Sequence, residues 1–322
     1  MRIFGYVCML MVVIASSCNK DDVITITFED KYYRAATLSS EESWDKVYEF
    51  TPAPGQFINE TKTGGFNGDE TTPEAAIEYA ERRMADDLYV SLGGFGGYIV
   101  VGFDHSVDNK VGYDLAIKGN SFSGSSEPGI VWVMQDEDGD GLPNDTWYEL
   151  AGSETGKTET IRNYSVTYFR PEKEQQPVKW RDCNGVEGEI DYLGVYHRQT
   201  YYYPAWIKED SYTLTGTRLK ERNFDRSENG TFWVLPEYDW GYVDNFSPID
   251  RLTDDDNANA ASNANHFDIS KAIDTDGKSV ELKYIDFVKV QCAVNSKSGW
   301  LGEVSTEVFG FIDYGLMLSR DE

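Results

Sequence analysis

Acidic residues alternate in the segment from 136 to 145, which reads DEDGDGLPND. Asp136, Asp138 and Asp140 match positions 1, 3 and 5 of a calcium loop, and a glycine follows at position 6, where such loops turn sharply. Calcium takes about six to eight oxygen ligands, and the backbone carbonyl of Leu142 at position 7 adds one. Because three like charges so close together favour a bound cation, the segment predicts a structural calcium site.

The end of this loop, which spans 136–149, departs from the EF-hand pattern. Trp147 stands where an EF-hand places its bidentate glutamate, so Asp145 or Glu149 must complete the ligand set. We expect no flanking helices, and the loop resembles the acidic loops of thrombospondin type 3 repeats more than an EF-hand. The alternative is a solvated acidic turn that holds no ion.

Aromatic residues gather in two other segments, 201–206 and 240–242. The run from 201 to 206 reads YYYPAW and follows His197 and Arg198. In an extended chain successive side chains point to opposite sides, so some of these rings should be exposed and able to stack on a sugar or a flat macrocycle. The alternative is that the rings pack beneath the loop. The candidate ligand-binding residues are Tyr201, Tyr202, Tyr203, Trp206, Trp240 and Tyr242.

Signatures of catalysis are missing from the sequence. The histidines His105, His197 and His266 are scattered, and neither a GxSxG nor an HExxH motif occurs. We therefore expect a protein that is not an enzyme. A glycosidase with paired carboxylates stays an alternative, because the 56 acidic residues include many chance pairs. Cys183 and Cys292 either pair or remain separate thiols, and no zinc motif accompanies them.

One helix and many strands must position these residues. Thr72 as N-cap, Pro73 at the first helical position and Glu74 in the first turn predict a helix of about 14 residues. Its apolar positions are Ile77, Ala80, Met84 and Leu88. The segment 92–97, which contains four glycines, precedes an apolar strand and not a helix, so it predicts a tight turn and not a phosphate loop.

Short apolar or alternating segments separated by turns predict the strands. The predicted strands are 23–28, 98–103, 113–118, 130–134, 146–150, 164–169, 211–215, 230–235, 285–292 and 304–309. We expect 113–118 to pair with 98–103, and the segment 239–266, rich in Asn and Asp, to form a long loop. This pattern indicates a mainly β fold, a β-sandwich or jelly roll with one short helix and long loops.

The N-terminus predicts export. Residues 1–17 combine Arg2 with an apolar run too short to span a bilayer, as in a signal peptide, and small residues lead to Cys18. This arrangement resembles a bacterial lipoprotein signal, with cleavage before Cys18 and lipidation of that residue. The following residues, to 22, read NKDD and resemble the signal that directs Bacteroidetes lipoproteins to the outside of the outer membrane.

The composition fits an exposed protein. The net charge is −27, which argues against nucleic acid or anionic lipid as partners and is compatible with divalent cations. Aromatic residues make up 14% of the chain, more than a disordered chain would contain. We expect a tether over 18–22 and a single ligand-binding domain over 23–322, attached to the membrane only through its lipid anchor.

Several segments together resemble one family of Bacteroidetes surface lipoproteins, usually called cell-surface or PKD-domain-containing proteins. They are SLGGFGG at 91–97 with VGFD at 101–104, NSF at 120–122 with EPGIVWV at 127–133, the acidic loop with WYEL at 147–150, and GWLGE at 299–303. The resemblance covers roughly residues 89 to 315 and implies a link to loci for TonB-dependent uptake, cobalamin loci among them. It transfers no ligand-binding residues.

These features lead to one expected function and two alternatives. We expect a surface lipoprotein that captures a ligand, cobalamin or another corrinoid, for a TonB-dependent outer-membrane transporter. The alternatives are a glycan-binding protein or glycoside hydrolase, and a structural or adhesive module.

Overall fold

The structure is a computed structural model that describes residues 30–227, 229–252 and 263–321. The predicted signal peptide, the lipidation site Cys18, the tether over 18–22 and the strand predicted at 23–28 lie outside the described residues. The described residues from 32 onward form one compact unit. Among the described residues, no helix has the length and apolar character needed to cross a membrane.

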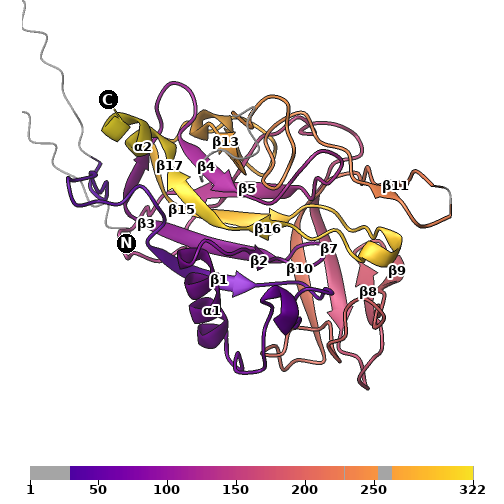
Figure 1. The fold of residues 1–322 in the computed structure, drawn as a ribbon. Coiled ribbons are helices and arrows are strands. Elements are labelled where there is room, and N and C mark those ends of the chain that lie inside the picture. The colour runs from indigo at the N-terminus through magenta and orange to yellow at the C-terminus, as the bar shows by residue number, and fades with distance from the viewer. Residues whose placement is uncertain (1–29, 228, 253–262, 322) are drawn as a thin grey trace, which may run out of the picture. The chain divides into compact units, whose positions relative to one another are not determined.

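The prediction of a mainly β fold is confirmed, with 32% of residues in strands against 11% in helices. The strands assemble into several antiparallel sheets (Figure 1). The strands are β1 (Lys46–Thr51), β2 (Val90–Ser91), β3 (Tyr98–Asp108), β4 (Leu115–Lys118), β5 (Gly129–Met134), β6 (Tyr148–Leu150), β7 (Ile161–Phe169), β8 (Val178–Asp182), β9 (Glu187–Ile190), β10 (Ser211–Arg218), β11 (Phe224–Asp225), β12 (Trp233–Val234), β13 (Ala264–Phe267), β14 (Ala272–Ile273), β15 (Tyr284–Cys292), β16 (Glu307–Val308) and β17 (Gly310–Asp313).

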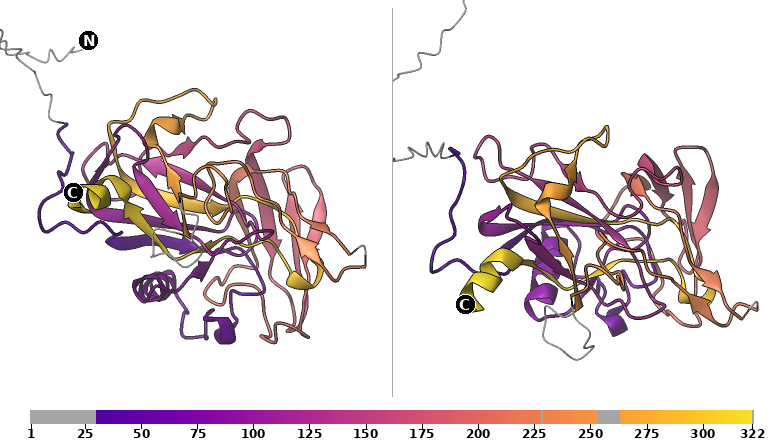
Figure 2. Two further views of the ribbon diagram at one scale, coloured as in Figure 1. Left: turned by 45° about the horizontal axis from the view of Figure 1, so that its top comes forward. Right: turned by 90° about the horizontal axis from the view of Figure 1, so that it is seen from above.

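The largest sheet has six strands in the order β1-β3-β15-β5-β6-β14. A four-stranded sheet, β10-β7-β8-β9, lies at one side of the unit, and a three-stranded sheet has the order β13-β4-β17 (Figures 1 and 2). Two further pairs are β11-β12 and β16-β2. The expectation that 113–118 pairs with 98–103 is wrong: β4 pairs with β13 and β17, whereas β3 pairs with β1 and β15. Alternation identifies a strand, but it does not select the strand's partner.

The predicted helix is present as α1 (Pro73–Ala85), and the Thr72 hydroxyl accepts a hydrogen bond from the Ala75 amide at 3.2 Å. Its buried residues include Ala80 and Met84, as predicted, but Leu88 lies beyond the helix and is exposed. A second helix, α2 (Tyr314–Asp321), was not anticipated. The structure also has the 3₁₀ turns η1 (Thr61–Thr63), η3 (Ile269–Lys271) and η4 (Gly299–Leu301).

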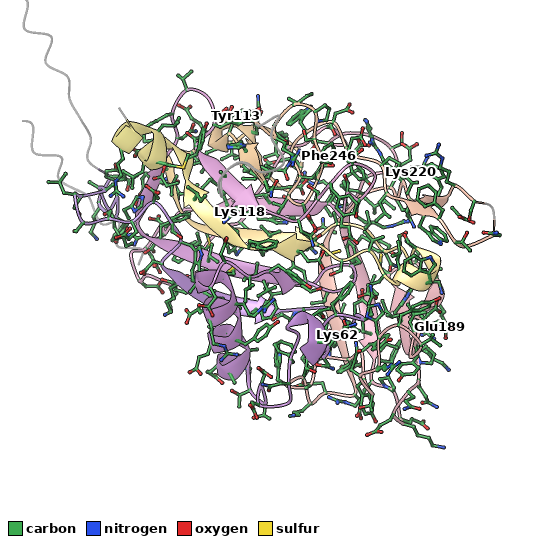
Figure 3. All side chains as sticks on the ribbon, in the orientation of Figure 1. Lys62, Tyr113, Lys118, Glu189, Lys220 and Phe246 are labelled. Atoms are coloured by element: carbon green, nitrogen blue, oxygen red, sulfur yellow. The ribbon has the colours of Figure 1, made fainter. Side chains whose placement is uncertain are left out.

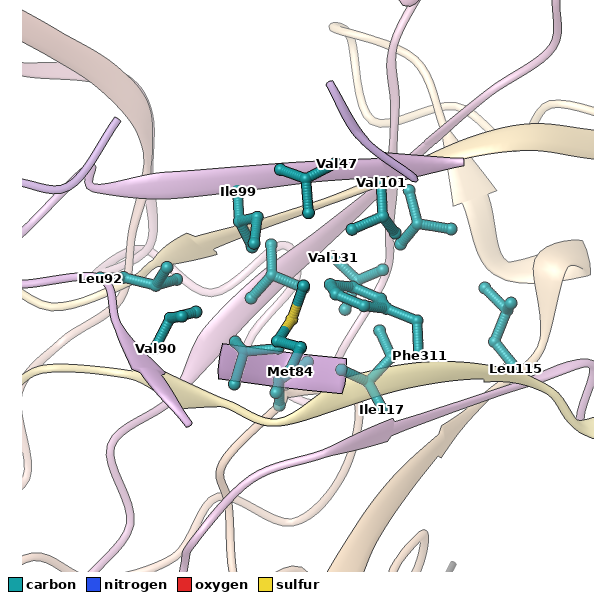
Figure 4. Packing of buried hydrophobic residues seen from close by; sticks show 14 of the residues in the cluster. Val47, Met84, Val90, Leu92, Ile99, Val101, Leu115, Ile117, Val131 and Phe311 are labelled. Atoms are coloured by element: carbon teal, nitrogen blue, oxygen red, sulfur yellow. The ribbon is translucent and has the colours of Figure 1, made fainter. Parts of the chain in front are cut away.

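The main hydrophobic core joins three elements. The inner residues of α1 pack with side chains of the six-stranded sheet, such as Val101 and Val131, and with Ile117 and Phe311 from the three-stranded sheet (Figure 4). A second cluster, rich in tyrosine, lies against the four-stranded sheet. These cores fix the ends of the strands and hence the loops that carry the candidate sites.

The glycine segment forms the tight turn that its sequence predicts, and β3 follows it directly. Gly93 and Gly96 have φ values of 70° and 83°, which favour glycine. A Cβ atom on Gly97 would lie 1.8 Å from the backbone oxygen of Leu92, so only glycine fits there.

Cys183 and Cys292 are both free thiols and do not form a disulfide with each other. Cys183 is exposed, and Cys292 lies buried in β15. Burial raises the pKa of the Cys292 thiol to about 12. We expect a thiol reagent at neutral pH to label Cys183 and to leave Cys292 unmodified in the folded chain from residue 19 onward. Counting reacted thiols before and after denaturation checks this, and labelling of folded Cys183→Ser would contradict it.

Asp114, at the start of β4, gives the fold a pH dependence. Burial raises the pKa of its carboxyl to about 6, against hydrogen bonds from the Lys110 and Ile269 amides. The folded state therefore binds a proton on the Asp114 carboxyl more tightly than the unfolded state does. This protonated carboxyl contributes its full stability below about pH 4, and the contribution falls as the pH rises to about 6. We expect wild type to lose about 1–2 kcal/mol over this range relative to Asp114→Asn. Urea unfolding at pH 4 and pH 7 measures the difference, and parallel pH profiles would refute it.

Candidate functional sites

The acidic loop is held by its first residue. Asp136 follows β5 and is buried; its carboxylate accepts hydrogen bonds from the amides of Gly139, Asp140 and Gly141 at 2.7, 3.2 and 3.0 Å. Gly139 and Gly141 have φ values of 77° and 74°. The loop thus folds around one carboxylate, as Asx turns do.

Three of the predicted calcium ligands lie close together. One carboxylate oxygen each from Asp136, Asp138 and Asp145 lies within 4.8 Å of the others. Asp145 also accepts a hydrogen bond from the Glu137 amide at 2.8 Å, which draws the end of the loop back to its start. Asp145 is therefore the residue that closes the acidic group, one of the two choices that the sequence left open.

The other predicted ligands, Asp140, Leu142 and Glu149, are not part of this group of three and form other hydrogen bonds or ion pairs. Asp140 accepts hydrogen bonds from the Leu142 amide and the Asn144 side chain, and the Leu142 carbonyl accepts one from the Asn144 amide at 2.9 Å. Glu149 is buried in β6, where it bonds to the Thr217 hydroxyl at 2.6 Å and pairs with Arg162 at 3.3 Å. Glu149 thus belongs to an interior ion pair and not to the group of three loop carboxylates.

The loop is anchored to the largest sheet. The Asp136 amide donates to the carboxylate of Asp286 in β15 at 2.9 Å. The Asp286 carboxylate also accepts from the Ser106 hydroxyl at 2.6 Å and pairs with Arg34 at 3.0 Å. Asp286 is fully buried and lies at an irregularity in the pairing of β15 with β3. It therefore fixes the start of the acidic loop on the core.

The aromatic run from 201 to 206 is mostly internal. Tyr202 and Tyr203 are buried in the tyrosine-rich cluster, and Tyr201 and Trp206 are partly exposed. The Tyr202 hydroxyl accepts from the Leu193 amide and donates to the His197 carbonyl, both at 3.0 Å. The expectation of exposed rings is wrong for Tyr202 and Tyr203, because this irregular segment turns both rings beneath the four-stranded sheet.

The second aromatic segment also contains one buried ring, Tyr242, and one partly exposed ring, Trp240. Tyr242 is buried, and its hydroxyl accepts a hydrogen bond from the Glu154 amide at 2.9 Å, so it offers no face to a ligand. Trp240 is partly exposed and lines a pocket of about 380 Å³ together with Tyr113, Ile249 and His266. Burial lowers the pKa of His266, whose Nδ1 donates to the Asp250 carbonyl at 2.8 Å. This Trp240 pocket is small and mainly apolar in its lining residues.

A larger hollow lies beside the buried aromatic run. It has a volume of about 890 Å³ and is lined by η1, the segment 195–199 and Trp300 of η4. Tyr196 and Trp300 are 55% and 40% exposed, and their ring centroids are 5.5 Å apart. Lys62 lies on this hollow and Tyr113 on the Trp240 pocket; Figure 3 shows the two residues well separated. We call this site the Tyr196–Trp300 hollow.

Polar and charged groups complete the lining of the Tyr196–Trp300 hollow. Lys62 and Arg198 are exposed there, although the chain as a whole is strongly acidic. His197 is held in place, because its Nδ1 lies 2.9 Å from the Glu60 carboxylate and its ring packs edge-on against Phe57. The hollow therefore offers ring faces for stacking and two cations for an anionic group.

Tyr196 and Trp300 are site residues that were not predicted from the sequence. Tyr196 precedes the predicted aromatic run by a few positions, and Trp300 belongs to the segment GWLGE that contributes to the family resemblance. Neither position carries a local signal of exposure, and only the fold brings them together. Comparison with models of known protein families and with curated proteins finds no match to this chain.

Proposed function

We propose that this protein is a non-catalytic ligand-capture protein and that its ligand binds in the Tyr196–Trp300 hollow. The observation that carries the proposal is the pair of exposed rings beside two cations in a hollow of about 890 Å³. Ligand sites typically measure about 300–1,000 Å³, so this hollow has room for a large flat ligand. The Trp240 pocket, at about 380 Å³, suits a smaller group.

Cobalamin or another corrinoid is the ligand we favour, for a TonB-dependent transporter in the outer membrane. The family resemblance supports this choice, and the lining of the hollow is compatible with it. A corrinoid has a flat macrocycle with a separate aromatic base for stacking, and a phosphodiester that Lys62 or Arg198 can pair with. The lipid anchor at Cys18 would keep the hollow close to the transporter and raise the local ligand concentration.

The arrangement of the sheets supports a β-sandwich-like fold for this binding domain. Residues of the six-stranded and three-stranded sheets share one core with α1. A calcium ion in the acidic loop would be structural, because the loop follows β5 and is anchored to β15 through Asp286.

Calorimetric titration of the chain from residue 19 onward with cyanocobalamin tests the proposed function. We expect micromolar or tighter binding, and a loss of affinity of at least about tenfold in Trp300→Ala and in Tyr196→Ala, because each removes a stacking face. Trp240→Ala is the matched control, since it removes a partly exposed ring from the other pocket.

Two results would contradict parts of this proposal. Binding that survives Trp300→Ala but is lost in Trp240→Ala would place the ligand in the Trp240 pocket. Absence of heat and of thermal stabilisation with micromolar cyanocobalamin would exclude the corrinoid, and a panel of oligosaccharides would then test the glycan alternative with the same variants.

A further inference from the structure

Three carboxylates from distant parts of the chain meet inside the protein. Glu127 lies just before β5, Asp244 follows Val243 in the segment after β12, and Glu307 belongs to β16. One carboxylate oxygen from each lies within 4.8 Å of the others. We call this group the interior carboxylate cluster; it is separate from the acidic loop, whose three carboxylates form a group of their own.

The backbone brings these three segments together. The Glu127 amide donates to the Asp244 carbonyl at 2.9 Å, and Gly129 and Val243 exchange two hydrogen bonds at 2.9 and 3.0 Å. The Glu307 amide donates to Asp244 Oδ2 at 3.0 Å. The positions of the carboxylates therefore follow from main-chain contacts and not from flexible side chains alone.

The cluster is acidic and poorly compensated. Asp244 and Glu307 are 0% and 3% exposed, and Glu127 is partly exposed. Backbone amides donate to them, including that of Asn120 to Asp244 Oδ1 at 2.8 Å, and the Glu307 side chain also contacts the side chains of Glu127 and Ser305. In the part of the chain that the structure describes, no lysine or arginine forms an ion pair with any of the three.

A second observation points to a ligand at this cluster. Oε1 of Glu307 is buried and has no hydrogen-bond partner within the protein. A buried carboxylate oxygen without a partner costs about 1–3 kcal/mol or more, and a bound group that supplied the partner would remove this cost. A cation among the three carboxylates would provide this partner and offset their mutual repulsion.

We propose that the interior carboxylate cluster binds a calcium ion. Calcium–oxygen distances are about 2.3–2.6 Å, so two oxygens on opposite sides of one ion are about 5 Å apart at most. The three carboxylate oxygens of the cluster lie within 4.8 Å of one another and so meet this limit. The acidic side chains offer only oxygen ligands, which hard cations prefer. The ion would join the segments before β5 and after β12 to β16, independently of ligand capture.

Calcium stoichiometry tests this proposal. The chain from residue 19 onward, stripped of metal and titrated with calcium in a calorimeter, is expected to bind one ion here in addition to any in the acidic loop. Glu307→Gln and Glu127→Gln each keep the side-chain shape and are expected to lower calcium affinity at this site more than about tenfold. Asp138→Asn, which alters only the acidic loop, should leave this site intact.

Glu303→Gln is the matched control. Glu303 is also buried with an unpartnered oxygen, Oε2, but is not one of the three clustered residues, so this variant should bind as many ions as wild type. If Glu307→Gln fails to fold by near-ultraviolet circular dichroism, Glu127→Gln decides, because its residue is the least buried of the three. Unchanged stoichiometry and affinity in Glu127→Gln, or loss of all calcium in Asp138→Asn, would overturn the proposal.

Discussion

Removal of calcium from the acidic loop with EGTA is expected to lower the free energy of unfolding by about 3 kcal/mol, relative to protein with calcium at about 100 times Kd. The physical reason is the proximity of three carboxylates, from Asp136, Asp138 and Asp145, within 4.8 Å of one another. Without a cation they repel each other, and the loop between β5 and β6 loses its central contact. Urea unfolding with and without calcium measures the change.

Two variants assign this effect to the loop. In Asp138→Ala, EGTA is expected to lower the free energy of unfolding less than in wild type, because the part of the effect that comes from the ion in the acidic loop is lost. Glu137→Ala is the matched control, because it also removes an exposed acidic charge from the same loop but no member of the group. An equal response in wild type and Asp138→Ala would show that the loop is a solvated acidic turn.

Replacement of Asp286 by alanine is expected to destabilise the protein by about 3 kcal/mol, the lower end of the cost of breaking a buried charge pair. The variant leaves three donors without their acceptor: the Asp136 amide, the Ser106 hydroxyl and the Arg34 guanidinium. Because Arg34 is 41% exposed and regains water, the cost stays at the lower end of that range. Calcium affinity of the acidic loop should fall as well, since the loop loses its anchor on β15.

Asp286→Asn separates the role of shape from the role of charge. Asparagine retains one acceptor oxygen, so it should cost less than alanine and preserve part of the calcium affinity. Urea unfolding and calorimetric calcium titration of both variants provide the measurements. If Asp286→Ala unfolds at the same urea concentration as wild type, Asp286 does not carry the anchoring role that its hydrogen bonds indicate.

Local patterns predicted α1 and the strands β3, β5 and β15 of the six-stranded sheet. The apolar segments at 98–103, 130–134 and 285–292 all lie in β3, β5 and β15, and Thr72 caps α1 as its sequence indicates. The signals in these segments are strong because they are contiguous along the chain.

Other elements escaped prediction for physical reasons. β8 and β9 form an edge hairpin with charged, largely exposed residues, and β1 lies in a segment that looks loop-rich. β17 and β13 are short strands whose identity depends on pairing with β4. Without an apolar periodicity of their own, such strands are determined by their partners and not by their own residues.

The same division applies to the sites. The acidic loop was predictable from local sequence, because the three carboxylates that cluster in it lie within ten positions and one glycine-assisted turn gathers them. Which aromatic rings are exposed depends on tertiary packing: the fold buries Tyr202, Tyr203 and Tyr242 and brings Tyr196 next to Trp300. It also assembled Glu127, Asp244 and Glu307 from three distant segments. Burial and long-range proximity result from the packing of the whole chain, and no local spacing of residues encodes them.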